Sequence, residues 1–179
     1  MIIIVGASAS GKTEITKVLI KDYNYHKCVT TTTRLPRVGE VDGKDYHFLN
    51  HETFMNKIKN NEFVEFIQYR DNYYGTQRKD IKNDAIVILE PNGGNELLRK
   101  LPGDIFLVLV ESTSDKRKSR MVSRGDNMHE INKRLASDDE LFSKDKLLKI
   151  DLLIQNENQT LEELACLIHT KYLQFLNKK

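Results

Sequence analysis

Residues 1–13 read MIIIVGASASGKT and contain the spacing G-x-x-x-x-G-K-T between Gly6 and Thr13. The β-branched run at residues 2–5 suits a buried parallel strand, because branched side chains are stiff at χ1 and pack well on a pleated surface. After Lys12, apolar residues recur at the spacing of one helix face, at Ile15, Val18 and Leu19. A strand, a glycine-rich loop and a helix in this order predict a phosphate-binding loop.

The predicted loop implies a definite chemistry. Its backbone N–H groups and the N-terminus of the following helix converge on phosphate oxygens, where the helix dipole favours negative charge. We expect Lys12 to reach the outer phosphates of a nucleotide and the Thr13 hydroxyl to bind Mg²⁺. The residues expected to contact the nucleotide here are Gly6, Ala7, Ser8, Ala9, Ser10, Gly11, Lys12, Thr13 and Glu14.

The composition narrows the remaining possibilities. A chain of 179 residues is long enough for one domain with a real core. Its formal charge of +2 gives no bulk attraction to nucleic acid or membrane, and no apolar run reaches membrane-spanning length. The opening apolar run is too short for a secretory signal. Cys28 and Cys166 lie far apart and no histidines pair at metal-ligand spacing, so we expect a cytoplasmic protein without a metal cage.

The pattern along the chain predicts an α/β fold. Apolar runs expected to form buried parallel strands occupy residues 1–5, 85–89, 105–110 and 150–154, with a weaker fifth around 27–30. Charged, helix-like stretches separate several of them, notably residues 114–124 and 161–175. Strands that alternate with helices predict a parallel sheet with right-handed crossovers and helices on its faces.

Two segments depart from this alternation. Residues 33–74 are polar and aromatic, with antiparallel-looking pieces at 45–49 and 62–69, and we read them as an inserted lobe. Residues 114–135 read as two helices that break at Arg124 and Gly125, with Asn127 and Glu130 resembling a capping box. The expected division is a core of residues 1–32, 77–113 and 136–179, an inserted lobe of residues 33–76 and a second inserted piece, made of two helices, at residues 114–135.

A second constellation is TTTTRLPR at residues 30–37. Pro36 stiffens a turn, and Arg34 and Arg37 stand three residues apart. Arginine suits phosphate because its planar guanidinium donates two parallel, charge-assisted hydrogen bonds. On these eight residues alone, a solvated basic loop remains the alternative.

A third constellation is EFVEFIQY at residues 62–69, followed by NYYGT at 72–76. Period-two alternation places Phe63, Glu65, Ile67 and Tyr69 on one face. A carboxylate at Glu65 inside an apolar face is costly unless donors meet it. Guanine offers an imino N–H beside an amino group, a donor pair that adenine lacks. The alternative is an edge strand with Glu65 at its solvated rim.

These motifs together resemble the signature of the guanylate kinases. The resemblance continues in GEVDGKDYHF at residues 39–48 and in RMVSRG at 120–125 with INKRL at 131–135, and residues 151–156 resemble the last core strand of that family. It extends along nearly the whole chain. It implies a P-loop kinase core with a parallel sheet flanked by helices, an inserted lobe for the nucleoside monophosphate and a helical lid.

The resemblance also implies roles for individual residues. The phosphate of the acceptor GMP would be held by Arg34, Arg37, Tyr46 and Tyr74. Guanine would be read by Glu65, Thr30 and Thr76, the two threonines standing where the family usually has serine. The donor ATP would be closed in by the lid arginines Arg120, Arg124 and Arg134, with Asn156 near its adenosine. Catalysis would depend on Lys12, Arg34, Arg120, Arg124 and Arg134, with Mg²⁺ on Thr13.

Two departures from the family pattern affect these expectations. Ala7 and Ala9 replace a proline and a glycine in the phosphate loop, and a methyl group at Ala9 conflicts with a backbone that needs positive φ. An acidic pair after the strand at residues 85–89 is reduced to Glu90, which we expect to help hold the guanine amino group or the metal shell.

The expected activity is transfer of the γ-phosphoryl group of ATP to GMP, and also dGMP, to give ADP and GDP. The expected partners are these small molecules, with no nucleic acid and no membrane, and the protein is a monomer or a homodimer. One alternative is a P-loop kinase for another small phosphorylated acceptor, against which Glu65, Tyr46 and Tyr74 argue. The other is a catalytically silent guanylate-kinase-like protein-binding module, against which the intact Lys12 and the lid arginines argue.

Overall fold

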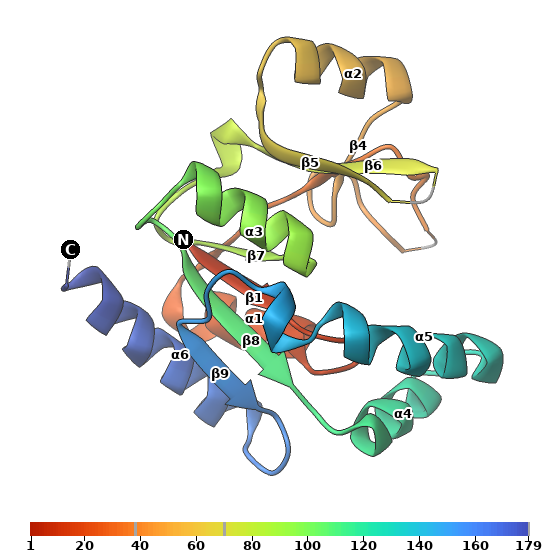
Figure 1. The fold of residues 1–179 in the computed structure, drawn as a ribbon, viewed down its shortest axis with the longest axis vertical. Coiled ribbons are helices and arrows are strands. Elements are labelled where there is room, and N and C mark those ends of the chain that lie inside the picture. Colours follow the sequence, from red (N-terminus) through yellow and green to blue (C-terminus); the bar gives the residue numbers. More distant parts are fainter. Residues whose placement is uncertain (38, 70, 179) are drawn as a thin grey trace.

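The apolar N-terminal run forms the middle strand of a five-stranded parallel sheet. The computed structural model describes residues 1–37, 39–69 and 71–178. The strand order is β2-β7-β1-β8-β9, from β2 (His26–Lys27), β7 (Ala85–Ile88), β1 (Ile2–Val5), β8 (Phe106–Glu111) and β9 (Leu152–Gln155). Every neighbouring pair in this order is parallel (Figure 1). The predicted α/β fold with a parallel sheet is therefore confirmed.

Helices cover both faces of this sheet because its central strands are apolar on both sides. Ile2 and Ile4 pack with α1 (Lys12–Tyr23) and α6 (Leu161–Leu176) in one buried cluster. Ile3 and Val5 point to the opposite face and pack with Leu97 of α3 (Pro91–Lys100) in a second cluster. These alternating contacts fix the position of Val5, after which the glycine-rich loop begins. Among the described residues, no helix is long and apolar enough to cross a membrane.

The inserted lobe contains a second sheet, with the order β4-β3-β6-β5. Its elements are β3 (Thr31–Thr32), β4 (His47–Phe48), α2 (His51–Lys59), β5 (Phe63–Tyr69), β6 (Asn72–Gln77) and the short 3-10 helix η1 (Arg78–Asp80). The expectation of an antiparallel piece near residues 45–49 was wrong, because β4 pairs in parallel with β3. The loop between these strands returns the chain to the end where β3 starts, so both strands run the same way.

The weak strand expected around residues 27–30 is divided between the two sheets. β2 ends at Lys27 in the core sheet, and Cys28 extends it by one hydrogen bond from its N–H to the Ile86 carbonyl (2.8 Å). Thr31 then begins β3 in the lobe. Thr30 therefore lies at the crossing between the two sheets, where the core and the inserted lobe meet.

A β-bulge changes the predicted alternation of β5. The register shifts between Phe63 and Glu65, so these two residues do not share a face as strict period-two alternation predicted. Phe63 contacts Phe66 instead, with ring centroids 6.4 Å apart, whereas Glu65 and Ile67 line the same cavity. The expectation for the Tyr69 side chain lies outside the described structure. The bulge separates the aromatic packing of the lobe from its polar site.

The aromatic side of the lobe forms a small core of its own. Phe54 of α2 is fully buried and stacks on Phe63 with a centroid separation of 4.4 Å. The ring of Tyr73 lies 5.6 Å from that of Phe54. On the other side, Lys100 at the end of α3 donates to the Val64 carbonyl (2.6 Å) and joins the lobe to the core.

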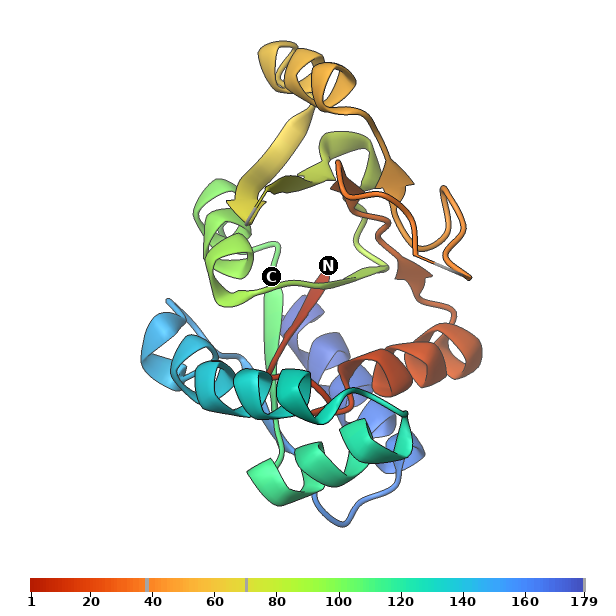
Figure 2. The same cartoon turned by 90° about the vertical axis from the view of Figure 1, so that its right-hand side faces the viewer.

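Two helices follow β8, as expected, and then the short 3-10 helix η2 (Lys144–Lys146) leads to β9. Helix α4 ends at Ser123 (Ser114–Ser123), and Gly125 follows with a φ of 82°, which lets the N–H of Asp126 reach the Met121 carbonyl (3.1 Å). Helix α5 (Met128–Leu141) is capped by Asn127, which accepts from the His129 N–H. This is not the capping box expected with Glu130. Helix α5 also continues beyond residue 135, where the lid was expected to end. Both views show the inserted lobe and these two helices well apart (Figures 1 and 2).

The stacked aromatic pair makes a prediction about stability. Phe54→Ala removes a fully buried ring and is expected to lower the free energy of unfolding by about 3–5 kcal/mol. Phe66→Ala, on the same lobe but with a side chain 43% exposed, is the control and is expected to cost less than about 1 kcal/mol. Urea unfolding measures both. Equal losses for the two variants would contradict this account of the lobe core.

Candidate active site

The phosphate loop joins β1 to α1, and its two glycines are required by close backbone contacts. A Cβ atom on Gly6 would lie 2.2 Å from the Val110 carbonyl oxygen. One on Gly11 would lie 2.1 Å from Nδ2 of Asn156, and Gly11 also has a φ of +105°. No side chain fits at such distances, so both positions accept only glycine.

Ala9 adopts the conformation that its sequence position predicted to be unfavourable. Its φ is 59°, in the left-handed region, where a Cβ atom costs roughly 1–2 kcal/mol. Backbone strain of this kind persists only where surrounding contacts hold it in place. The loop therefore needs support from other parts of the chain.

Three side chains from different elements supply that support to consecutive loop residues. Asp138 of α5 accepts a hydrogen bond from the Ser8 N–H through Oδ2 (2.6 Å). Arg120 of α4 donates from Nη1 to the Ala9 carbonyl (3.1 Å). Asn156, after β9, donates from Nδ2 to the Ser10 carbonyl (2.8 Å). Asn156 is buried beneath the loop, and the adenosine contact expected for it stays a prediction.

The Lys12 ammonium lies within the loop itself. Its Nζ donates to the carbonyl oxygens of Gly6 (2.6 Å) and Ala7 (2.7 Å). Burial lowers the pKa of Lys12 to about 8, and the negative charge of Asp138 opposes this shift. The ammonium is held by neutral carbonyl oxygens, which phosphate oxygens can replace with stronger charge-assisted bonds.

A cavity of about 250 Å³ opens beside the loop and collects much of the predicted donor site. Its lining comprises Ala9, Gly11, Lys12, Thr13, Glu14, Arg120 and Arg124. The Arg124 guanidinium lies here while also paired with Asp126, and Glu14 pairs with Lys17 at the surface (2.8 Å). Arg134 does not line this cavity, and its Nη1 lies 3.4 Å from Asp126. Two of the three predicted lid arginines therefore border the same space as Lys12.

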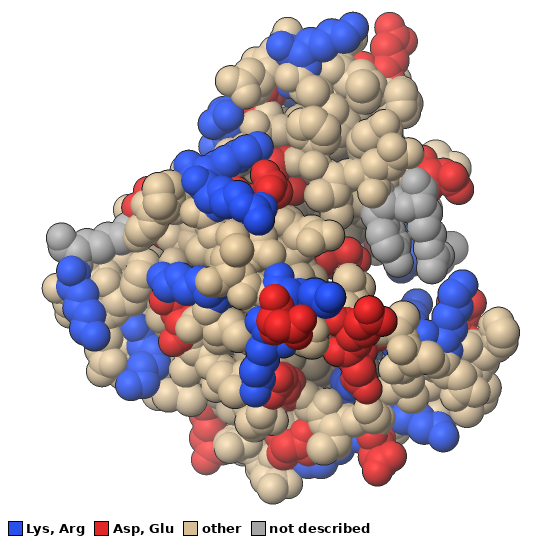
Figure 3. All heavy atoms as spheres, in the orientation of Figure 1, with Lys and Arg blue, Asp and Glu red and all other residues tan. Residues whose placement is uncertain are grey.

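A second cavity, of about 230 Å³, lies between the lobe and the core sheet. Figure 3 shows the surface hollowed between the lobe and the lid helices. Five residues predicted to bind the acceptor line this cavity together with apolar and glycine neighbours: Thr30, Tyr46, Glu65, Tyr74 and Glu90. The remaining three predicted acceptor residues, Thr76, Arg34 and Arg37, do not line it.

Glu65 is the buried carboxylate of this cavity, 2% exposed. The Thr76 hydroxyl donates to its Oε1 (2.6 Å), and the backbone at Gly93 passes close to Oε2. Burial raises the pKa of Glu65 to about 7, and the hydrogen bond from Thr76 opposes this shift. The carboxylate therefore has unused acceptor capacity in a site that restricts water.

Arg34 is already engaged by a carboxylate. Its Nη2 donates to both Glu40 oxygens (2.8 and 2.9 Å), and this contact raises the pKa of Arg34. Its guanidinium also lies over the Tyr46 ring, 5.5 Å from the centroid. Arg37 is exposed, and its backbone N–H donates to Glu40 (2.7 Å). The Glu40 carboxylate thus occupies the position beside Arg34 and Arg37 where the phosphate of the acceptor was expected.

Glu90 lines the second cavity. It stands at the N-cap position of α3, and burial raises its pKa, with the charges of Asp138 (raising) and Lys12 (lowering) as the next causes. Among the described residues, no group of three or more histidines, cysteines, aspartates or glutamates could hold a metal ion. Mg²⁺ binds through few protein oxygens and takes its other ligands from phosphates and water. The Thr13 hydroxyl, at the start of α1, fits that donor set.

Sequence reasoning missed three residues of this site. Asp138 and Arg117 were assigned no role, and Glu40 was not recognised as the partner of Arg34. Arg117 is 2% exposed and does not line the donor cavity, unlike Arg120 and Arg124 on the same segment. Helical spacing was the signal in the sequence that could have identified Arg117 and Asp138. Arg117 lies on the buried face of α4 with Met121, and Asp138 lies on the buried face of α5 with Ile131. Two opposite charges therefore stand at positions where apolar residues are expected.

A parallel sheet, a G-x-x-x-x-G-K-T loop after its first strand, an inserted lobe and arginines that border the loop define a P-loop nucleotide kinase. The guanylate kinase family model matches residues 1–171. A guanylate kinase from Lactiplantibacillus plantarum is 38% identical over 145 residues, which cover 76% of this chain and 70% of that relative. One from Clostridioides difficile is 33% identical, covering 88% of this chain and 80% of the relative. The chain belongs to the guanylate kinase family, and so to the phosphotransferases.

A solved structure supports the fold independently. The crystal structure of guanylate kinase from Anaplasma phagocytophilum superimposes with a TM-score of 0.67 at 22% sequence identity. The match covers 97% of this chain and 85% of that one. At this identity the likeness concerns the fold, which includes the inserted lobe and the lid helices.

The loop geometry makes a second prediction. Gly11→Ala combines a positive φ with a contact of 2.1 Å and is expected to lower the free energy of unfolding by about 3 kcal/mol or more. Gly103→Ala is the matched control, because its φ is +81° and nothing lies within 4 Å of the added methyl group. It is expected to cost about 1 kcal/mol. Urea unfolding distinguishes the two, and a Gly11→Ala loss no larger than that of the control would refute the close contact.

Proposed function

We propose that this chain transfers the γ-phosphoryl group of ATP to GMP, giving ADP and GDP, and to dGMP, giving ADP and dGDP. The observation that carries the proposal is the buried Glu65 carboxylate, which accepts from the Thr76 hydroxyl and lines a cavity separate from the donor cavity at the phosphate loop. Two separate cavities, of which one is lined by Lys12, suit a reaction that brings two nucleotides together. A protein-binding module without catalytic activity would not require a second cavity lined by polar groups.

Glu65 supplies the selectivity for guanine. Its carboxylate accepts two parallel hydrogen bonds, which match the adjacent imino and amino donors of guanine. Adenine would present a ring acceptor to the same carboxylate and leave it unpaired in a buried site. Thr76 fixes one carboxylate oxygen, and the Thr30 hydroxyl lines the same cavity.

The acceptor phosphate is proposed to bind Arg34, Arg37, Tyr46 and Tyr74. Nη2 of Arg34 donates to both Glu40 oxygens while Nη1 donates to the Leu35 carbonyl, so the guanidinium is already held beside one anion. Tyr46 and Tyr74 lie side by side, with ring centroids 6.3 Å apart, at the mouth of the cavity. The phosphate of GMP would bind the Arg34 guanidinium together with the Glu40 carboxylate, or would displace that carboxylate from it.

The donor phosphates are proposed to bind the loop N–H groups, Lys12, Arg120 and Arg124, with Arg134 approaching as the lid closes. Mg²⁺, held through Thr13 and with Glu90 nearby, would neutralise charge on the transferring group. Catalysis then needs positioning and charge neutralisation and no covalent intermediate. Lid closure would exclude water, which otherwise competes as the acceptor.

The proposed function is tested by a coupled assay of ADP release with different acceptors. Catalytic efficiency is expected to fall in the order GMP, IMP, AMP, with a ratio on the order of 10⁴ between GMP and AMP, because IMP loses one donor and AMP loses both. Efficiency with dGMP should be close to that with GMP. Equal efficiency with GMP and AMP would leave only a general nucleotide kinase.

Glu65→Gln is expected to lower efficiency with GMP by roughly 10²-fold or more, without a proportional loss with AMP. The matched control is Glu62→Gln, which removes a half-exposed carboxylate from the residue before the same strand. It should leave the acceptor ratio unchanged. The same fall in both variants would show a nonspecific charge effect and would exclude Glu65 as the guanine reader.

The raised pKa of Glu65 adds a prediction about pH. Only the ionised carboxylate can accept both guanine donors, and the pKa of about 7 means that the free protein is partly protonated at neutral pH. GMP affinity is therefore expected to fall about tenfold per pH unit below pH 7 and to be level above it. Calorimetric titration from pH 5.5 to 8.5 measures this. Glu65→Gln keeps the titration of the GMP phosphate but lacks this dependence, and identical slopes would contradict the assignment.

A further inference from the structure

The contact between Asp138 and the phosphate loop is not explained by the chemistry proposed above. Asp138 lies ten residues into α5, and its side chain turns into the protein rather than toward either nucleotide cavity. It is 6% exposed. Its Oδ2 accepts the Ser8 N–H at 2.6 Å, so a carboxylate is bonded to the backbone of a loop whose function is to bind phosphate.

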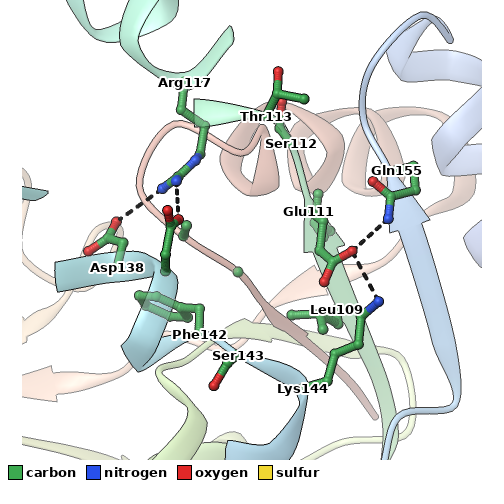
Figure 4. Close-up of a pocket in the computed structure, with 14 residues that line it drawn as sticks. Leu109, Glu111, Ser112, Thr113, Arg117, Asp138, Phe142, Ser143, Lys144 and Gln155 are labelled. Atoms are coloured by element: carbon green, nitrogen blue, oxygen red, sulfur yellow. Dashed lines mark hydrogen bonds and ion pairs between the residues drawn. The ribbon is translucent and has the colours of Figure 1, made fainter. Parts of the chain in front are cut away.

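A buried arginine lies beside this carboxylate and offers it an opposite charge. Arg117 of α4 has its Nη1 3.9 Å from Oδ2 of Asp138, and its Nη2 donates to the Asp139 carboxylate and to Ser114 (3.1 Å). Figure 4 shows Arg117 pointing toward Asp138 at one end of a cavity of about 480 Å³. Gly6 and Ala7 of the phosphate loop line the same cavity. Asp138 and Arg117 therefore contact the loop from a cavity other than the one that Lys12 lines.

Burial of these two charges is unfavourable for folding. Desolvation of a carboxylate and a guanidinium costs several kcal/mol per ion, and the attraction between the two charges offsets this only in part. An apolar pair of similar volume at the interface of α4 and α5 would pack as well without that cost. A buried ion pair is thus weak evidence for a contribution to stability. The hydrogen bond from the Ser8 N–H to Asp138 indicates instead that the pair holds the backbone of the phosphate loop in position.

The loop in this chain has a particular need for such a contact. Ala9 follows Ser8 and has a φ of 59°, a conformation that relaxes unless neighbouring residues are held. The Ser8 contact precedes the strained residue, and the Asn156 contact with the Ser10 carbonyl follows it. Asp138 and Asn156 thus fix the backbone on both sides of Ala9.

We propose that Asp138 is a positioning residue for the donor nucleotide, which holds the Ser8–Ala9 segment in its phosphate-binding geometry, with Arg117 holding Asp138. The proposal rests on the proposed ATP-dependent function. It predicts that the loss of Asp138 acts on ATP and leaves the acceptor cavity, which Asp138 does not line, unchanged. It also predicts that the need for Asp138 depends on the methyl group of Ala9.

The test begins with steady-state kinetics of Asp138→Ala and calorimetric titration of the variant with Mg·ATP in the absence of GMP. The Kd and KM for ATP should rise about tenfold or more, while the KM for GMP should stay within about twofold. Asp138→Asn keeps an oxygen that can accept the Ser8 N–H, so it should recover most of the affinity. The control Glu140→Ala removes an exposed carboxylate from the same helix and should leave both constants unchanged.

A double-mutant cycle separates loop positioning from general stability. In the Ala9→Gly background, glycine adopts the same φ without strain, so the ATP effect of Asp138→Ala should be markedly smaller. Additive effects of the two substitutions would overturn the proposal, as would an ATP affinity of Asp138→Ala within twofold of the wild type. If Asp138→Ala does not fold, Asp138→Asn with and without Ala9→Gly provides the same cycle. Failure of the wild-type chain to bind Mg·ATP would refute the proposed function instead.

Discussion

The backbone path between Val5 and Lys12 is the constraint on which the rest of the structure depends. Two buried clusters on opposite faces of the core sheet fix β1, and α1 packs on the first of them, so both ends of the phosphate loop are anchored. Between the anchors, Gly6 and Gly11 pass so close to neighbouring atoms that a side chain would collide. The remaining freedom is removed by side chains from α4, α5 and the segment after β9. The path of the loop is fixed because both of its ends are anchored and three other segments of the chain contact it.

In the acceptor cavity, specificity depends on the buried Glu65 carboxylate. An ionised carboxylate without hydrogen-bond donors is unfavourable in a buried site, so a base that supplies two donors binds better than one that supplies none. The bulge in β5 keeps Phe63 in the aromatic core of the lobe while Glu65 turns to the cavity, so one strand serves both packing and recognition. Contacts at both ends of the lobe, between Lys100 and Val64 and at the crossing near Thr30, connect it to the core.

The sequence predicted what local chemistry determines. The G-x-x-x-x-G-K-T spacing placed the loop, the apolar runs placed four strands of the core sheet, and the missing glycine indicated a special backbone position at Ala9, whose φ is positive. Contacts between distant segments could not be read in the same way. The parallel pairing of β4 depends on the path of a long loop, and the bulge at Glu65 depends on the partner strand. Asp138 and Arg117 looked like ordinary helix-surface charges until α4 and α5 were placed side by side.

The central claim is that the cavity lined by Lys12 and the cavity lined by Glu65 form one site, adenosine on the loop side and guanosine on the lobe side. The most direct test is calorimetric titration of the chain with two bisubstrate analogues, adenosine joined through five phosphates to guanosine and to a second adenosine. The account predicts one mixed analogue bound per chain, at least about 10²-fold more tightly than the adenosine–adenosine analogue, because the latter faces Glu65 without donors. Equal affinity for the two analogues would contradict it.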